Sequence, residues 1–212
     1  MTKSIRLLLV DDHAIVRSGL RMLLDSQPDM TVVAEAERGE QALARLCQQR
    51  ADVMILDLSM PGIGGLETLR RARLRYQDLQ ILVLSVHDEV VYQQQAHLIG
   101  ASGFISKAAN PERMLAAVRA LAQGKSHWPE LPGGEEATGL KAVIDGFNTR
   151  EFEVFCRLAK GLSVARIAEE LCVSYKTVAN YGTCVRRKLQ VSSTAELANI
   201  ARALGVLPNH MP

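Results

Sequence analysis

Short apolar runs recur through the first half of the chain, and a stretch with helical periodicity follows each of them. The runs occupy residues 5–10, 31–36, 53–56, 81–84 and 103–105. They are too short for ordinary helices, and glycine, proline or polar residues bound them. This pattern predicts the buried strands of a parallel sheet.

Apolar residues three and four positions apart predict the helices that lie between and after these strands. The predicted helices span residues 13–24, 38–49, 66–76, 89–98 and 111–122. Asn110 is placed to cap the last of them, with Pro111 at its first position. Regular alternation of strand and helix predicts an α/β fold with a doubly wound, five-stranded parallel sheet. We expect the strand order 2-1-3-4-5, which places the first and third strands side by side.

From residue 148 onward the periodicity is helical only. The predicted helices span residues 149–160, 164–171, 175–189 and 195–204. Their expected N-caps are Asn148 or Thr149, then Ser163, Ser174, and Ser193 or Thr194. Two short helices joined by a tight turn, the second begun by a hydroxyl cap, form the helix-turn-helix plan of DNA-binding proteins.

The stretch between these two parts has a different character. Residues 124–147 mix proline, glycine and acidic residues without periodicity, which indicates a flexible linker with a short helix near residues 140–144. The sequence therefore predicts an α/β domain over residues 1–123, this linker, and a small all-α domain over residues 148–212.

Polar side chains stand at the carboxyl ends of four of the predicted strands. Asp57 follows the run at 53–56, and a pair of acids follows the first strand. A hydroxyl and an ammonium follow the fourth and fifth strands. The full set is Asp11, Asp12, Asp57, Ser85 and Lys107. Open α/β sheets bind ligands outside the carboxyl ends of their strands, so we expect these groups to form one site.

Composition narrows the class of protein further. The length of 212 residues suits two ordinary domains, and 48% apolar residues supply enough material for their cores. The four cysteines lack metal-ligand spacing, so we interpret them as reduced thiols. No apolar run reaches the ~18 residues of a membrane span, so we expect a cytoplasmic protein with no membrane contact.

Local charge distinguishes the predicted third helix of the second domain. Residues 171–195 contain no acidic side chain, and their basic residues suit a polyanion. These residues are Lys176, Arg186, Arg187 and Lys188. The helix predicted at 66–76 is also rich in arginine, which we interpret as a solvated face rather than a partner surface.

Taken together, these motifs resemble a response-regulator receiver domain, with its flavodoxin-like fold, followed by a LuxR-type helix-turn-helix domain. This pairing is that of the NarL/FixJ family, and residues 60–66 and 176–181 look most similar to the GacA/UvrY branch. The C-terminal likeness rests on residues 149–151, 161–163, 177–178 and 188–189, among others. The resemblance covers nearly all of the chain except the linker.

The resemblance implies a role for each strand-end residue. Asp57 is the implied phospho-acceptor, which receives its phosphoryl group from a sensor histidine kinase. The implied Mg²⁺ ligands are the side chains of Asp11, Asp12 and Asp57 and the backbone carbonyl of Ser59. Lys107 offsets charge on the transferred group and Ser85 donates to it. Phe104 stands where relatives carry a switch aromatic, more often Tyr, and the alternative is a permanently buried core ring.

The implied function is that of a two-component response regulator, not a turnover enzyme. Phosphorylation is expected to control dimerisation and sequence-specific binding to promoter DNA, and so to regulate transcription. The alternative is a regulator that acts mainly by protein contact, with weak or no DNA recognition. A third hypothesis, a phosphotransfer enzyme that acts on a small molecule, is disfavoured because the sequence offers no second catalytic base.

The expected DNA contacts lie on the helix predicted at 175–189. Lys176 suits a guanine edge, Asn180 suits adenine, and Ala179 offers a methyl group to thymine. Thr177, Tyr181 and Lys188 are expected at phosphates. Relatives often carry basic or imidazole side chains at 179, 181 and 182, so we expect weak binding by a monomer. A homodimer joined through residues 195–204 would supply the missing affinity.

Overall fold

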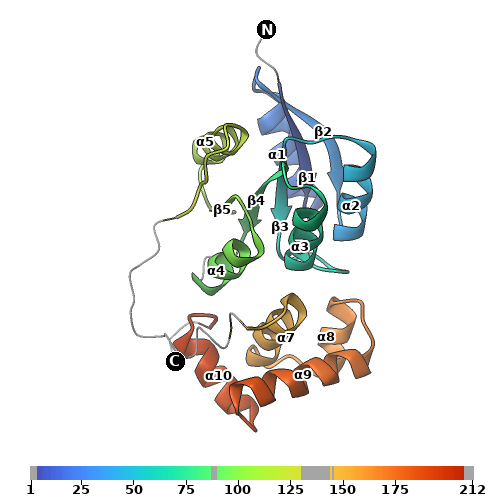
Figure 1. The fold of residues 1–212 in the computed structure, drawn as a ribbon, viewed down its shortest axis with the longest axis vertical. Helices are drawn as coiled ribbons and strands as arrows, with labels where there is room; N and C mark the ends of the chain where they lie inside the picture. Colours follow the sequence, from blue (N-terminus) through green and yellow to red (C-terminus); the bar gives the residue numbers. More distant parts are fainter. Residues whose placement is uncertain (1–3, 87–89, 130–143, 145, 208–212) are drawn as a thin grey trace. The chain divides into compact units, whose positions relative to one another are not determined.

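The structure is a computed structural model that describes residues 4–86, 90–129, 144 and 146–207, and the chain divides into two compact units near residue 130. The first unit is a parallel sheet enclosed by helices (Figure 1), and the second is a group of helices. All four cysteines are free thiols. Among the described helices, none has the length and apolar content needed to cross a membrane.

Five parallel strands form the sheet of the first unit. They are β1 (Ile5–Val10), β2 (Met30–Ala36), β3 (Val53–Asp57), β4 (Gln80–Ser85) and β5 (Gly103–Ser106). Their order is β2-β1-β3-β4-β5, which confirms the predicted topology. Because β1 and β3 are neighbours in the middle of the sheet, the chain reverses its winding direction between them, and Asp11 is brought next to Asp57.

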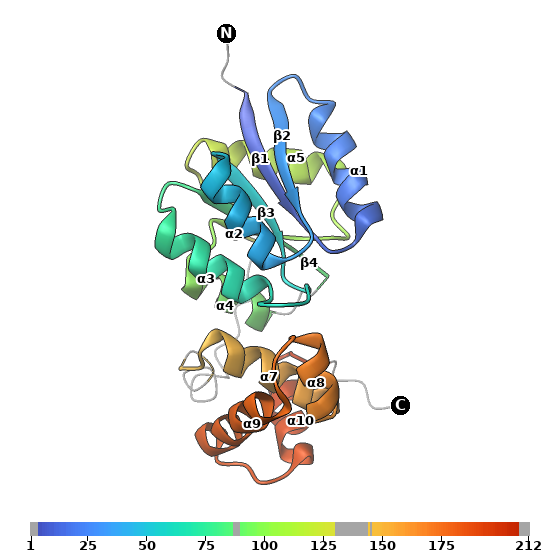
Figure 2. The same ribbon diagram turned by 90° about the vertical axis from the view of Figure 1, so that its right-hand side faces the viewer.

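Five helices cover the two faces of this sheet, as the views in Figures 1 and 2 show. They are α1 (Ala14–Asp25), α2 (Gly39–Gln48), α3 (Gly65–Arg75), α4 (Val90–Ile99) and α5 (Pro111–Ala122). The predicted boundaries agree to within a residue or two. Asn110 caps α5 as predicted, because its side chain accepts a hydrogen bond from the N–H of Arg113 at 2.9 Å.

The core of the first unit follows from strands that are apolar on both faces. Leu7 and Leu9 of β1 lie in a buried cluster with Leu24 of α1 and with Val118 and Leu121 of α5. Residues 8 and 10 of β1 point to the opposite face and are buried as well. Burial on both faces holds the strand ends at fixed positions, and the polar side chains that follow them inherit that rigidity.

Most arginines of α3 are exposed, as the sequence suggested, but Arg73 is less solvated. Arg73 is partly buried, and its guanidinium donates to the carbonyl of Gly100 at 2.9 Å and to the hydroxyl of Ser102 at 3.2 Å. Burial lowers the pKa of Arg73. Arg70 and Arg71 both bond to Glu67. Helical periodicity alone does not show which long side chains fold back onto a neighbouring loop.

The free edge of β5 carries a short addition that comes from within the expected linker. His127 pairs with Gly103 as a parallel bridge, and its carbonyl accepts the N–H of Phe104 at 2.8 Å. The next residue, Trp128, packs edge-to-face on His97 of α4 at 4.8 Å. Backbone groups on a sheet edge favour such pairing, although no strand pattern marks it. Residues 130–143 and 145, which hold most of the expected short helix, lie outside the described residues.

Four helices make up the described part of the second unit. They are α7 (Thr149–Ala159), α8 (Val164–Glu170), α9 (Tyr175–Leu189) and α10 (Thr194–Ala203). The observed N-caps are Asn148, Ser163, Ser174 and Ser193. Gly161 and Gly205 follow helices with positive φ angles of 81° and 70°, which a residue with a Cβ adopts only with strain.

The core of the second unit joins the helix-turn-helix pair α8–α9 to α7 and α10. Its buried side chains include Phe155, Ile167, Val178, Val185 and Leu197. Helix α9 packs mainly on α7, and α10 also packs on α7. This packing leaves one face of α9 outward, where Lys176, Asn180 and Arg187 are exposed.

Candidate functional site

The polar residues predicted at strand ends meet at one edge of the sheet. Asp57 is the last residue of β3, and Asp11 directly follows β1, its neighbour. Lys107 directly follows β5, and its backbone N–H donates to the carbonyl of Ser85 at 2.8 Å. Because parallel strands end at the same edge, three loops deliver these groups to one place.

Lys107 holds the two central carboxylates together. Its ammonium lies 2.7 Å from Oδ2 of Asp57 and 2.7 Å from Oδ2 of Asp11. Asp57 is 0% exposed and Asp11 is 2% exposed. The other oxygen of Asp57, Oδ1, accepts the backbone N–H of Ser59 at 3.0 Å. The Asp57 carboxylate is therefore held at both oxygens and stays in one orientation.

Burial and the neighbouring charges have opposite effects on the pKa values of Asp57 and Lys107. The pKa of Asp57 is raised, because burial penalises its charged form more than the bonds from Lys107 and Ser59 stabilise it. Burial also acts to lower the pKa of Lys107, but the bonds to Asp11 and Asp57 outweigh it, so that pKa is raised. The ammonium is the positive charge that allows two buried carboxylates to lie side by side.

The same carboxylates form a group able to hold a cation. Ligand atoms of Asp11, Asp12, His13 and Asp57 all lie within 4.8 Å of one another. Three of the four donors are carboxylate oxygens, the hard ligands that Mg²⁺ prefers. Sequence reasoning did not assign His13 to the site. Its Nδ1 lies 2.9 Å from Oδ1 of Asp12, and the only signal in the sequence was its place directly after the acid pair.

Ser85 and Phe104 were expected to respond to the transferred group. Ser85 is buried at the end of β4 and pairs in register with Ser106 of β5. The Phe104 ring is 1% exposed, so it lies in the interior in this structure. That position corresponds to the alternative of a core ring and equally to the inward state of a switch aromatic.

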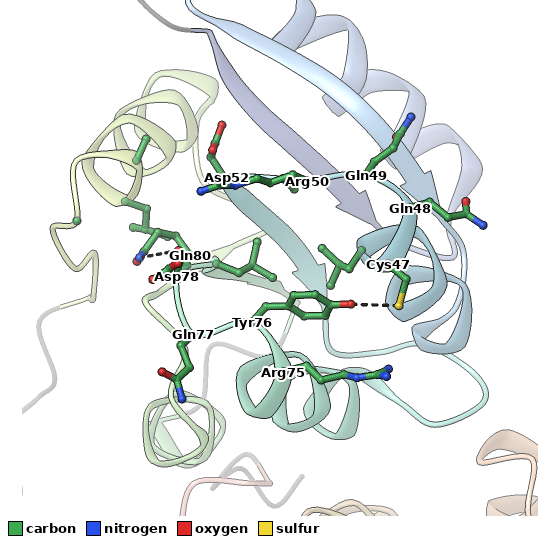
Figure 3. Close-up of a pocket in the computed structure, with 16 residues that line it drawn as sticks. Cys47, Gln48, Gln49, Arg50, Asp52, Arg75, Tyr76, Gln77, Asp78 and Gln80 are labelled. Atoms are coloured by element: carbon green, nitrogen blue, oxygen red, sulfur yellow. Dashed lines mark hydrogen bonds between the residues drawn. The ribbon is translucent and has the colours of Figure 1, made fainter.

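A cavity of about 680 Å³ lies at the opposite edge of the sheet (Figure 3). Its lining includes Asp52, which precedes β3, and Gln80, which begins β4, so it faces the amino ends of the strands. In Figure 3, Tyr76 points toward Cys47, and its hydroxyl lies 3.1 Å from the thiol sulfur. The lining does not include the acids at the carboxyl ends, so this cavity is separate from the acid cluster.

Helix α9 presents its predicted DNA contacts to different degrees. Lys176 and Asn180, four residues apart on one face, are exposed, and Thr177, Ala179 and Tyr181 are partly exposed. The Thr177 hydroxyl lies 2.7 Å from that of Ser174, which caps the helix. A bidentate contact to a base requires an accessible side chain on the outward face, and Asn180 meets that requirement.

Gly182 and Lys188 both contact other parts of their own domain. Gly182 is buried, and a Cβ there would meet Leu158 of α7 at 3.4 Å, so α7 approaches α9 closely at this position. Lys188 was expected at a phosphate. Its ammonium instead lies 2.6 Å from Oε2 of Glu151 and 3.0 Å from the carbonyl of Gly146, so it already has partners inside its own domain. The assignment of Lys188 to a phosphate stays a prediction, and these partners argue against it.

An acid cluster with one lysine at the switch point of a flavodoxin-like sheet, followed by a helix-turn-helix unit, defines a class: receiver-controlled DNA-binding proteins. Comparison with known families agrees, because residues 7–119 match the response regulator receiver domain and residues 145–201 match the bacterial regulatory proteins of the luxR family. The chain belongs to the NarL/FixJ family of response regulators.

Individual relatives cover nearly the whole chain. The transcriptional activator protein ExaE of Pseudomonas putida is 42% identical over 95% of this chain and 97% of its own length. The response regulator UvrY of Escherichia coli, the branch expected from the motifs, is 33% identical over 93% of each chain. ExaE is thus more similar in sequence than UvrY is.

Solved structures contain the same two kinds of domain in the same order along the chain. RcsB of Salmonella typhimurium superposes with a TM-score of 0.69 at 27% identity, covering 96% of this chain and 99% of that one. A complex of RcsB with DNA gives a TM-score of 0.68 at 26% identity, over 96% and 100% of the two chains. The chain is accordingly a response regulator with a receiver domain and a LuxR-type DNA-binding domain that regulates transcription.

Proposed function

We propose that Asp57 accepts a phosphoryl group from the phospho-histidine of a sensor kinase, and that this modification controls dimerisation and DNA binding. The observation that carries the proposal is the buried Asp57 carboxylate, held at one oxygen by Lys107 at 2.7 Å and at the other by the N–H of Ser59 at 3.0 Å. A carboxylate fixed in this way is a nucleophile in a constant orientation.

Each site residue has a separate role in the proposed phosphoryl transfer. A carboxylate oxygen of Asp57 forms a bond to phosphorus while the phosphorus–nitrogen bond of the phospho-histidine breaks, and the leaving imidazole keeps the electron pair and takes a proton from solvent water. Asp11, Asp12, Asp57 and the carbonyl of Ser59 would hold Mg²⁺, which supplies positive charge beside the phosphoryl oxygens. Lys107 then donates to the new phosphoryl group, and Ser85 supplies a second donor from β4.

The modification is stoichiometric rather than catalytic in this proposal, so the protein is not a turnover enzyme. The output lies in α9, where we propose that Lys176 and Asn180 contact bases. Thr177, Ala179 and Tyr181 flank those contacts at the groove and the phosphates. Two copies joined through α10 would place two recognition helices on one promoter site, which multiplies a small set of contacts.

Labelling tests the receiver part of the proposal. The full-length chain is incubated with a small acyl phosphate or a phosphorylated kinase domain, with Mg²⁺ or with a chelator. We expect label on wild type with Mg²⁺ only, no label on Asp57→Asn, and normal label on the matched control Asp78→Asn, because Asp78 is exposed at the opposite edge of the sheet. Label retained by Asp57→Asn contradicts the acceptor assignment.

DNA binding tests the output part. Affinity for promoter fragments from the source genome is measured at low salt, with and without phosphorylation, by fluorescence anisotropy. We expect phosphorylation to change the affinity and to raise the dimer fraction in sedimentation. A fully labelled protein that binds no DNA under these conditions supports the alternative, a regulator that works by protein contact.

A further inference from the structure

The last turn of α9 carries a lysine whose charge is engaged inside the domain. Lys188 Nζ lies 2.6 Å from Oε2 of Glu151 and 3.0 Å from the carbonyl oxygen of Gly146. The same ammonium stands 5.6 Å from the centre of the Phe147 ring. Two of these partners, Gly146 and Phe147, belong to the segment through which the chain enters the second unit, and the third belongs to the first turn of α7.

Glu151 binds more than this lysine. It is the third residue of α7 and closes a capping box, because its Oε2 accepts the N–H of Asn148 at 2.8 Å while its own N–H donates to the Asn148 side chain at 2.9 Å. The Glu151 side chain is only 7% exposed. One carboxylate therefore holds the start of α7 and the end of α9, and it has no solvent to replace a lost partner.

We infer that Lys188 is a positioning residue for DNA recognition, which fixes α9 against α7 and anchors the incoming chain at Gly146. A phosphate would have to displace a carboxylate that lies 2.6 Å away and is itself largely buried. Because Glu151 neutralises the ammonium, Lys188 adds little to the positive potential that DNA meets. This inference rests on the DNA-binding function of the domain.

Lys188 connects two parts of the domain that are distant in the chain. Its ammonium is shared by Gly146, where the linker ends, and by the C-terminal end of the recognition helix. Movement of the chain at Gly146 is therefore transmitted to α9 by a charge-assisted hydrogen bond, without passing through the apolar core. The ring of Phe147 adds to the anchor, since it also packs edge-to-face on Phe155 of α7 at 5.9 Å.

The test compares Lys188→Met, which keeps the apolar stem and removes the charge, with Lys176→Met as the matched control on the exposed N-terminal half of the same helix. Thermal unfolding, the affinity for cognate and random DNA, and the salt dependence of each affinity are measured on the full-length chain. DNA measurements are made well below the lower Tm, so that every variant is fully folded.

We expect Lys188→Met to lower the Tm of the C-terminal domain by at least about 4 °C, because it leaves the buried Glu151 carboxylate without a counter-charge. It should also reduce the ratio of cognate to random affinity several-fold, while the slope of log affinity against log salt stays unchanged. Amide exchange at Phe147 should quicken at least about tenfold. Lys176→Met should weaken DNA binding and leave both the Tm and the exchange at Phe147 unchanged.

A double-mutant cycle with Glu151→Gln completes the test. If Lys188 acts through Glu151, the double variant unfolds at a Tm no lower than that of the worse single variant. A salt slope that falls by about one unit in Lys188→Met, with an unchanged Tm, identifies a phosphate contact and overturns the inference. Should wild type bind no DNA at all, the Tm and the cycle still test the anchor, so the two failures are distinguishable.

Discussion

Replacement of Lys107 by Met tests the electrostatic design of the proposed phospho-acceptor site. The side chain is 12% exposed and is bonded at 2.7 Å to two carboxylates that are almost fully buried. Methionine fills a similar volume but leaves Asp11 and Asp57 as neighbouring buried anions without a counter-charge. In metal-free buffer at neutral pH, the fold of the receiver domain should therefore lose stability.

The size of the loss follows from the burial of the partners. Removal of one member of a buried ion pair costs about 3–5 kcal/mol. The raised pKa of Asp57 indicates that this group can take up a proton when the ammonium is gone, which limits the cost, so we expect about 3 kcal/mol. Mg²⁺ and the ammonium compete for the same carboxylates, so the metal should bind the variant more tightly. At ~100 times its Kd, the metal restores about 2.7 kcal/mol.

Urea unfolding measures this loss of stability when it is carried out in two buffers and with a control variant. Wild type, Lys107→Met and Lys125→Met are unfolded in chelator and in excess Mg²⁺, with the m-value checked for constancy. Lys125 is an exposed lysine of the same domain, so its variant should match wild type in both buffers. If Lys107→Met matches wild type in chelator, Lys107 is not the charge that stabilises the acid pair, and the reasoning fails.

Three further predictions concern other parts of the chain. Asn180→Ala should lose ~1–3 kcal/mol on the cognate DNA site and relax specificity at one base pair; equal weakening on random DNA, in the same anisotropy assay, would contradict base contact. Gly103→Val should lower the free energy of unfolding in urea by about 1–3 kcal/mol, because a Cβ would lie 2.6 Å from the carbonyl of His127. An unchanged urea midpoint would show that the segment at His127 moves away without loss of stability. The hydrogen bond from Arg70 is the main cause that lowers the pKa of Glu67; burial opposes it, the bond from Arg71 adds to it, and the pKa falls from 4.5 to about 2. The ionised Glu67 therefore stabilises the fold above pH 4.5, and this contribution to stability is lost as the pH falls through 2. The stability difference between wild type and Glu67→Gln should shrink over that range, and a difference that is constant with pH would refute the ion-pair account.

Much of the architecture could be predicted because local patterns carry it. Buried parallel strands need apolar side chains on both faces, so the five runs stand out, and the alternation with helices limits the topology to few choices. Asn110, Ser163 and Ser174 were recognisable as caps because a helix start requires an acceptor for its free N–H groups. The strand-end acids were recognisable for a related reason, since a carboxylate at the end of a buried strand can face only the crevice.

The partners of long side chains were decided by tertiary structure. Lys188 and Arg73 each stand in a sequence context typical of a solvated surface, yet the side chain of each bonds to a segment distant in the chain. His127 likewise bonds to β5, but through its backbone. Gly182 lies inward because α7 approaches α9 closely there, a property of the packing and not of either helix alone. Periodicity assigns a residue to a face of its own element, and the element that covers that face is known only when the chain has folded. The sequence by itself therefore determined the elements, their order and the acid cluster at the strand ends, and only the tertiary structure decided which cations have partners within their own domain.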